Sequence, residues 1–269
     1  MGAVLMVEGT SQGAGTSLVC AALCRYFRQA GYSVAPFGAK MLVKNMWAQD
    51  FGFLGWEQFL QAEAACLNPT VNLHPVFLLQ KNHSYDLYWQ GKIVAQVTWH
   101  EFQHAFAPKT LALAREALEA LRRSYDLVIV DGGGNPGENK LLQQEIITLD
   151  IKEKLKAPTL LVADIEWGGM FASVMGTFAL LAEAEKAHIG GIIVNRFRGR
   201  QENLLPGLEM LEELVQKPVL GVLGYYHQVP LATAPAQLAA HKEREAAYQL
   251  LSSALQEQVD LSFVMQLLT

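Results

Sequence analysis

The segment from Gly9 to Ser17 contains the clearest pattern for chemistry in this sequence, a glycine-rich loop with several hydroxyl residues. It follows a short apolar run, Ala3 to Val7, and opens onto a helix-like stretch, Leu18 to Ala30. This order is typical of a phosphate-binding loop, because glycines let backbone N–H groups turn inward and the helix start adds partial positive charge. The residues that we expect to bind nucleotide phosphates are Gly9, Thr10, Ser11, Gly13, Gly15, Thr16 and Ser17.

This loop lacks the lysine around which such motifs are built. In the pattern G-x-x-x-x-G-K-[ST], the lysine reaches the β- and γ-phosphates and the hydroxyl residue binds Mg²⁺. Thr16 occupies the lysine position, whereas Ser17 keeps the hydroxyl position. We therefore expect ATP and Mg²⁺ to bind more weakly here than in a complete loop.

Apolar runs bounded by turn residues alternate with helix-like stretches along the chain. The alternation predicts βαβ units and an α/β fold, a P-loop-like doubly wound, mostly parallel sheet. The predicted strands are Val4–Val7, Ser33–Phe37, Leu127–Val130, Thr159–Ala163, Gly191–Val194 and Val219–Leu223. The predicted helices are Leu18–Ala30, Trp56–Cys66, Pro108–Arg123, Gln143–Lys156, Met170–Ala187 and Leu204–Val215.

Three polar, glycine-rich loops follow predicted strands, and they are Gly9–Ser17, Asp131–Glu138 and Asp164–Gly169. Ligands bind beyond the carboxyl ends of parallel strands, so we expect these loops to share one site. Asp131 is predicted to bind Mg²⁺ beside Ser17, and the alternative is an Asx turn that caps its own loop. Asp164 and Glu166 either belong to the substrate site or cap the following helix.

Two further regions extend this core. The alternating segment Tyr85–Val97 contains a Gln90-Gly91-Lys92 turn and predicts a β-hairpin. Four of the five tryptophans lie between Trp47 and Trp99. They either fill a core or form a flat apolar wall for a ring-shaped ligand, with Trp89 among the substrate residues.

The C-terminal part is predicted to be helical. Pro230 and Pro235 mark a connector after Tyr225, and helices are expected from Gln237 to about Gln256 and over Leu261–Leu268. We therefore divide the chain into an α/β domain, residues 1–224, and a connector with a helical tail, residues 225–269.

Composition narrows the function classes. A net charge of −5 argues against nucleic acid as the main partner, because phosphate contacts need clustered Lys and Arg. The apolar stretch Thr159–Ala182 is interrupted by acidic residues and a glycine pair, so we expect no membrane span. The N-terminus lacks a signal-peptide pattern, and three cysteines do not suggest a disulfide framework. These features predict a cytoplasmic protein.

Taken together, the motifs resemble the synthetase domain of cobyric acid synthase. They are Gly9-Thr10-Ser11 with Ala14-Gly15, Ala35-Pro36-Phe37, Leu60–Ala65, Asp131–Pro136, Asp164–Ser173 and Asn195–Gly199. The resemblance covers roughly residues 1 to 224 and is specific, because the motifs occur in the family's order. Members of that family use ATP and glutamine-derived ammonia to amidate side-chain carboxylates of a cobalt corrinoid. Dethiobiotin synthetase shares the fold and is a more distant relative.

The resemblance implies roles for particular residues. Asn195 stands where the family reads the adenine ring, and Asp131 stands where a family glutamate aligns as a Mg²⁺ ligand. The residues expected on the corrinoid side are Lys40, Gln61, Trp89, Asp164 and Glu166.

The resemblance also implies a missing domain. In the family, a glutamine amidotransferase domain and a short helical tail follow the synthetase domain. Here the segment from Glu243 to Leu261 is similar to that tail and follows after only a short connector. The expected partners are a corrinoid, a separate glutamine amidotransferase subunit and a second copy of the chain in a homodimer.

Charged residues of the family pattern are replaced at several positions. Uncharged or oppositely charged residues stand there, namely Gly13, Thr16, Gly38, Trp167 and Arg200. Lys40 and Lys44 are candidates to replace the cation lost at position 38. Phosphoryl transfer depends on charge stabilisation, so we expect a catalytically impaired member, a pseudoenzyme that binds a corrinoid or a nucleotide. The alternative is an active ligase that amidates cobyrinic acid diamide with ammonia from a separate subunit.

The segment from His100 to His104 spells H-E-x-x-H, which on a helix forms a zinc site. It lies between the predicted hairpin and Pro108, which leaves little room for a long helix. We expect the match to be a coincidence, and the alternative is a histidine that meets the corrin cobalt or its side chains.

Overall fold

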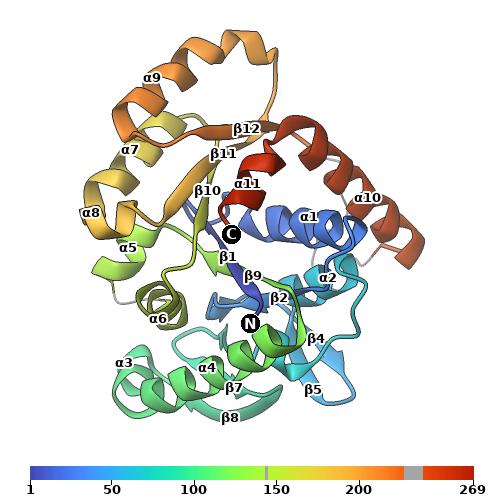
Figure 1. Cartoon of the computed structure of the whole chain (residues 1–269). Coiled ribbons are helices and arrows are strands. Elements are labelled where there is room, and N and C mark those ends of the chain that lie inside the picture. The colour runs from blue at the N-terminus through green and yellow to red at the C-terminus, as the bar shows by residue number, and fades with distance from the viewer. Residues whose placement is uncertain (143–144, 227–238) are drawn as a thin grey trace.

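Parallel strands that are buried on both faces form the centre of the molecule (Figure 1). The computed structural model describes residues 1–142, 145–226 and 239–269. Within these residues, six parallel strands form one sheet in the order β12-β11-β10-β1-β9-β2. Their bounds are β1 Ala3–Gly9, β2 Val34–Gly38, β9 Leu127–Gly133, β10 Thr159–Asp164, β11 Ile189–Phe197 and β12 Val219–Gly224. The predicted α/β fold is confirmed.

Alternation along β1 explains the layers on either side of the sheet. Leu5 and Val7 pack into one apolar cluster with α1 and α10, whereas Val4 and Met6 pack into another with α4. A third cluster joins β10 and β11 to α7 and α9. The helices are α1 Thr16–Gln29, α2 Trp56–Ala64, α4 Ala107–Ser124, α5 Pro136–Leu141, α6 Ile146–Leu155, α7 Met170–Leu180, α8 Glu183–Lys186, α9 Leu205–Val215, α10 His241–Gln258 and α11 Leu261–Gln266.

The region between β2 and α4 adds smaller sheets. One has the order β3-β6-β7-β8, with β3 Leu42–Val43, β6 Val76–Gln80, β7 Tyr85–Trp89 and β8 Lys92–Val97. The other is the pair β4 Met46–Gln49 and β5 Gly52–Gly55. The predicted hairpin is therefore confirmed as β7 and β8. Gln90 and Gly91 both have positive φ in its turn, as a two-residue hairpin loop of type I′ requires.

Two helix predictions need correction. The helix predicted over Met170–Ala187 is interrupted, because Leu181 and Ala182 are extended and α8 then begins with its own cap, a hydrogen bond from Ala182 N to Glu185. The segment around His100 is helical, contrary to the prediction of little room. The short helix α3, Trp99–Glu101, continues through a π-helical turn, Phe102–Phe106, into α4. Pro108 stands in the first turn of α4, directly after the π-helical turn.

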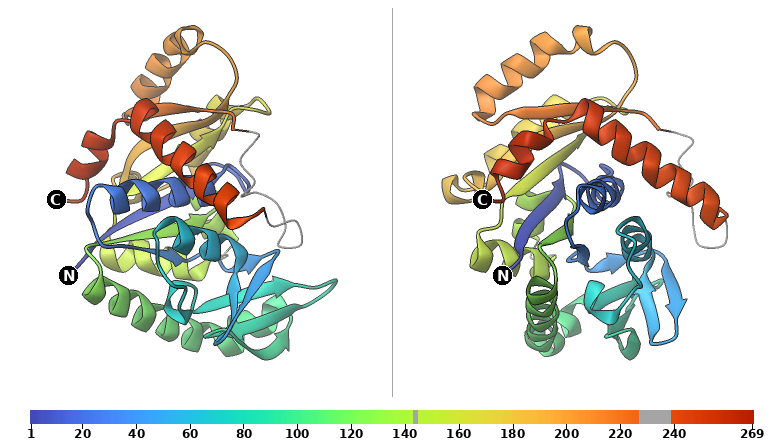
Figure 2. Two further views of the ribbon diagram at one scale, coloured as in Figure 1. Left: turned by 90° about the vertical axis from the view of Figure 1, so that its right-hand side faces the viewer. Right: turned by 45° about the vertical axis from the view of Figure 1, so that its right-hand side comes forward.

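Helix α10 from the C-terminal part lies along α1, and Figure 2 shows it crossing the same face of the sheet. Tyr248 and Leu255 of α10 are fully buried there. The predicted start of this helix at Gln237 and that of the earlier helix at Gln143 lie outside the described residues. None of the helices in the described part of the chain has the length and apolar character to cross a bilayer.

Candidate functional site

The loop between β1 and α1 owes its shape to glycines at two tight positions. Gly13 and Gly15 have φ values of 84° and 98°, which favour glycine. A Cβ atom on Gly15 would lie 2.2 Å from Nδ2 of Asn195, so the approach of the loop to β11 also requires glycine. Gly15 is the N-cap residue of α1 and leaves the helix start free of any side-chain cap. The helix N-terminus therefore opens toward the loop and can take an anion.

Asp131, at the end of β9, collects the hydroxyl groups of this loop. Its carboxylate accepts hydrogen bonds from Ser17 Oγ at 2.7 Å, Thr16 Oγ1 at 3.2 Å and Gln61 Nε2 at 2.9 Å. The residue is fully buried. The amide of Gly133 also donates to Asp131 at 3.4 Å, so the Asx turn considered above is present as well. Two segments distant in sequence thus converge on a carboxylate of a third segment.

Ser17 and Asp131 fit Mg²⁺ by their chemistry. Mg²⁺ prefers hard oxygen ligands and usually takes one or two from protein carboxylates and hydroxyls. The hydroxyl of Ser17 and a carboxylate oxygen of Asp131 lie 2.7 Å apart beneath the loop. A cation bound there would replace the hydrogen bond between them. Thr16 adds no positive charge, and its hydroxyl turns inward to Asp131.

Lys40 and Arg196 bring positive charge to a cavity of about 330 Å³ beside the loop. The cavity is lined by residues of the loop, by Lys40, Leu42, Lys44, Trp56, Glu57 and Leu60, and by Gly133, Gly134 and Arg196. The Lys40 amine lies 3.7 Å from the carboxylate of Glu57. Burial alone would lower the pKa of Lys40, but the carboxylates of Glu57, Asp131 and Glu145 outweigh it and the pKa is raised. Lys40 therefore remains a cation at the cavity wall.

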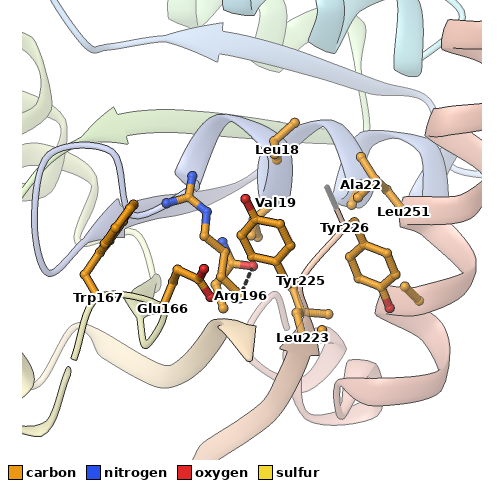
Figure 3. Close-up of a pocket in the computed structure, with 13 residues that line it drawn as sticks. Leu18, Val19, Ala22, Glu166, Trp167, Arg196, Leu223, Tyr225, Tyr226 and Leu251 are labelled. Carbon is orange, nitrogen blue, oxygen red and sulfur yellow. Dashed lines mark hydrogen bonds between the residues drawn. The ribbon is translucent and has the colours of Figure 1, made fainter. Parts of the chain in front are cut away.

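A second cavity of about 320 Å³ adjoins the first, since Leu18 and Arg196 line both. Figure 3 shows it from the side, with α1 residues above and the segment after β12 below. Its wall is largely apolar and aromatic, and comprises Leu18, Val19, Ala22, Trp167, Leu223, Tyr225, Tyr226, Leu251 and Ala254. Polar groups at its edge are Glu166, Asn195 and Arg196. Such a cavity suits a planar ring.

Asn195, Asp164 and Glu166 lie together at the ends of β10 and β11. Asn195 Nδ2 donates to the carbonyl of Ala14 at 2.9 Å and so holds the loop. Asp164 pairs with Arg196 at 2.6 Å, and Glu166 pairs with Arg198 at 2.8 Å. The helix-cap alternative for the two acids is wrong, because α7 begins after Gly169 without a side-chain cap.

The structure brings most predicted residues to this edge of the sheet but leaves Trp89 apart. Its Nε1 donates to Thr110 at 3.2 Å, and its ring packs against Phe106 with the amine of Lys109 above it. Trp89 thus fills space between the hairpin and α4. Trp56 behaves differently, since it lines the first cavity while stacking on Phe59.

Sequence reasoning missed Glu145. Its carboxylate accepts a hydrogen bond from the amide of Met41, and burial raises its pKa to about 7. The predicted helix Gln143–Lys156 placed Glu145 in a first turn, where an acidic residue is ordinary. Tyr225 and Tyr226 were missed because no motif marks them.

His74 explains why glycine stands at position 38. The histidine is fully buried beside β2, and its Nε2 lies 3.0 Å from the carbonyl of Lys40. A Cβ atom on Gly38 would lie 2.7 Å from the His74 ring and 2.8 Å from Gln58. A lysine side chain at position 38 therefore has no room, whereas Lys40 reaches the cavity from two residues further along.

The H-E-x-x-H segment does not form a metal site in the described part of the chain. Among the residues that the structure describes, no group of three or more His, Cys, Asp and Glu side chains could hold a metal ion. The rings of His100 and His104 stack with centroids 4.1 Å apart. Glu101 instead caps the helix start through Thr98.

Comparison with known proteins identifies relatives of this arrangement. The family described as CbiA, the CobQ/CobB/MinD/ParA nucleotide binding domain, matches residues 5–237. The chain is 40% identical over 223 residues to cobyric acid synthase of Thermoanaerobacter sp. (strain X514), covering 82% of this chain and 44% of that protein. It is 41% identical over 229 residues to cobyric acid synthase of Desulforamulus reducens, covering 83% of this chain and 44% of that protein. The chain thus spans less than half the length of these curated relatives.

Among solved structures, the chain is similar to the Signal Recognition Particle 54 kDa protein from Aeropyrum pernix K1 in complex with GDP. The TM-score is 0.50 at 18% identity, covering 99% of this chain and 49% of that one. This likeness supports the fold alone.

Proposed function

Because the chain belongs to the CobQ/CobB/MinD/ParA nucleotide-binding family and resembles cobyric acid synthases, we propose that it binds a magnesium nucleotide and a corrinoid but transfers phosphate poorly. The observation that carries the proposal is the contact of Thr16 with Asp131. The residue in the lysine position turns inward to a carboxylate, and the first turn of α1 contains no lysine or arginine of its own.

The expected loss of rate follows from charge. Developing negative charge on a transferred phosphoryl group is stabilised by lysine and Mg²⁺ placed in advance. Removing one such donor costs on the order of 10²–10³ in rate. Binding suffers less, because the backbone loop and the Ser17–Asp131 pair are intact. The site is thus suited to binding a nucleotide but hydrolyses it slowly.

The two cavities suggest separate positions for the phosphates and the base of a nucleotide. We place the phosphates in the first cavity, beside the loop and Lys40, and the base in the second, beside Asn195 and the tyrosines. The corrinoid would meet the open side of the first cavity, where Lys40 lies, with Asp164 and Glu166 at the junction. Gln61 is fully buried against Asp131 and is left out of this assignment. Trp89 lies apart from both cavities and is left out of this assignment.

A second candidate function is active amidation of a corrinoid carboxylate, with ammonia from a separate amidotransferase subunit. Lys40 favours it, since this partly buried cation lines the phosphate cavity and could take over part of the lost lysine's role. The division into a catalytic domain, residues 1–224, and a tail that once followed an amidotransferase domain belongs to this proposal.

Restoring the lysine tests the first candidate. Thr16→Lys should bind Mg-ATP about 10- to 100-fold more tightly, because a charge-assisted hydrogen bond contributes about 1.5–3 kcal/mol. Titration calorimetry of both proteins measures this. Ala30→Lys, which adds the same charge at the exposed far end of α1, should leave the affinity unchanged. Equal affinity of Thr16→Lys and the unaltered protein would show that the loop is no longer shaped for phosphate.

A further inference from the structure

We propose that the C-terminal helix α10 is a working wall of the second cavity and that Gln258 is a positioning residue for Tyr226. The inference rests on the proposed function, since it concerns the site that would take the nucleotide base. It adds to that site a helix that lies beyond residues 5–237, which the family model matches. Gln258 does not itself line the cavity, but its side-chain amide holds two residues that do.

Helix α10 packs against α1 at one end of the cavity. Leu251 and Ala254 of α10 line the cavity together with Leu18 and Ala22 of α1, and Figure 3 shows Leu251 beside Ala22. Leu251, Ala254 and Gln258 follow each other at intervals of three and four residues, which places them on one face of the helix. Without this face, the apolar side of the cavity would open to solvent.

Gln258 joins the end of α10 to the segment after β12. Its Nε2 donates to the hydroxyl of Tyr226 at 2.9 Å, and its Oε1 accepts from the amide of Gly224 at 3.1 Å. Gly224 and Tyr226 both line the cavity. One side-chain amide therefore fixes both the backbone that leaves the sheet and the ring that covers the cavity.

Backbone contacts hold this end of α10 in place. Gly221 pairs with Val259 in an antiparallel bridge, and the amide of Asp260 donates to the carbonyl of Leu220 at 2.7 Å. A Cβ atom on Gly221 would lie 2.0 Å from the carbonyl oxygen of Gln258, so only glycine allows the approach. The position of Gln258 relative to β12 is thus set by the main chain.

The other end of α10 is fastened to α2 by Glu63. This carboxylate accepts from Arg244 Nε at 2.7 Å, from the Tyr248 hydroxyl at 2.7 Å and from His241 Nδ1 at 2.9 Å. Burial alone would raise the pKa of Glu63, but the hydrogen bonds from Arg244 and Tyr248 outweigh it and the pKa is lowered. Glu63 follows Gln61, which donates to Asp131, by two residues, so α2 lies between the phosphate-side cluster and α10.

A second clamp on α10 provides a matched control. Arg25 of α1 donates to both carboxylate oxygens of Glu245, at 2.6 and 2.8 Å. Neither residue lines the second cavity. Changes at Glu245 therefore remove a contact of α10 away from the cavity and leave Gln258 and Tyr226 unchanged.

The test compares a ligand that has a base with one that has none. Gln258→Leu and Tyr226→Phe should each weaken binding of Mg-ADP about three- to tenfold, the range for a lost hydrogen bond. Binding of magnesium tripolyphosphate should stay within about twofold, and the double variant should bind no worse than either single variant. Glu245→Gln should bind both probes like the unaltered protein. Calorimetry gives the affinities.

Undiminished Mg-ADP binding by Gln258→Leu would overturn the inference, as would an equal loss for both probes. If the unaltered protein binds neither probe, the proposed function fails instead. Hydrogen exchange then decides the inference separately. The amides of residues 222–226 should exchange at least about tenfold faster in Gln258→Leu than in Glu245→Gln, and equal protection would contradict the positioning role.

Discussion

The carboxylate of Asp131 collects hydrogen bonds from Thr16, Ser17 and Gln61 where solvent does not reach it. A buried charge is costly unless it is paired and hydrogen-bonded. Here the hydroxyls and the nearby amine of Lys40 meet that need in the free protein. A Mg²⁺ ion would therefore compete with contacts that are already satisfied.

Glu145 gives a prediction at the scale of one residue. Burial raises the pKa of Glu145 from an ordinary 4.5 to about 7. Between these two pH values, the folded protein keeps a proton on Glu145 that the unfolded chain has lost. Its contribution to stability is present below pH 4.5 and is lost as the pH rises through 7. A tenfold change in proton affinity is worth about 1.4 kcal/mol, so the loss is about 3 kcal/mol at most.

Glu145→Gln, which keeps an acceptor for the amide of Met41, should remove this loss. Between pH 4.5 and pH 8, the free energy of unfolding of the variant should rise relative to the unaltered protein by up to about 3 kcal/mol. Urea denaturation across this range measures the difference. His74, whose pKa burial lowers to about 4, affects both proteins equally. Parallel pH profiles would show that Glu145 is charged in the folded state.

At the scale of elements, the buried ion pair between Arg244 and Glu63 is one of the contacts that attach α10 to α2. Arg244 is 6% exposed and donates to Glu63 through two nitrogens. Arg244→Ala leaves the Glu63 carboxylate without its cation, and breaking a buried pair in this way costs about 3 kcal/mol.

Chemical denaturation should show this lower free energy of unfolding. The control is Lys186→Ala, which removes the ion pair with the exposed Glu183 and should change stability by less than about 0.5 kcal/mol. If the two variants lose the same small amount, α10 is held by its apolar contacts and not by Glu63.

The elements themselves were largely predictable. Strands buried on both faces are continuous apolar runs, and such runs predicted the strands Thr159–Asp164 and Leu127–Gly133. The break at Leu181 was not predictable, because apolar residues continue through it and only the turn geometry separates α7 from α8. The helical run before Pro108 was missed because proline at a first turn looks, in sequence, like the end of a helix.

At the scale of the whole molecule, the parallel sheet brings the loop, Asp131 and Asn195 to one edge, as was predicted from the polar loops that follow the strands. The second cavity could not be predicted in the same way. Its walls come from α1, from the segment after β12 and from α10, which are joined only by long-range packing. No local sequence pattern at Leu251 or Gln258 predicts that α10 packs beside this cavity.

The most direct measurement of the central claim is phosphate release by the unaltered protein. The assay uses saturating Mg-ATP, with cobyrinic acid diamide and ammonia present. The Thr16→Lys variant is measured under the same conditions for comparison. Loss of a cation that stabilises the transferred phosphoryl group predicts release at least about 100-fold slower than in the lysine variant. Release at about 1 s⁻¹ or faster, within the ordinary range for enzymes, would contradict the account and support an active ligase.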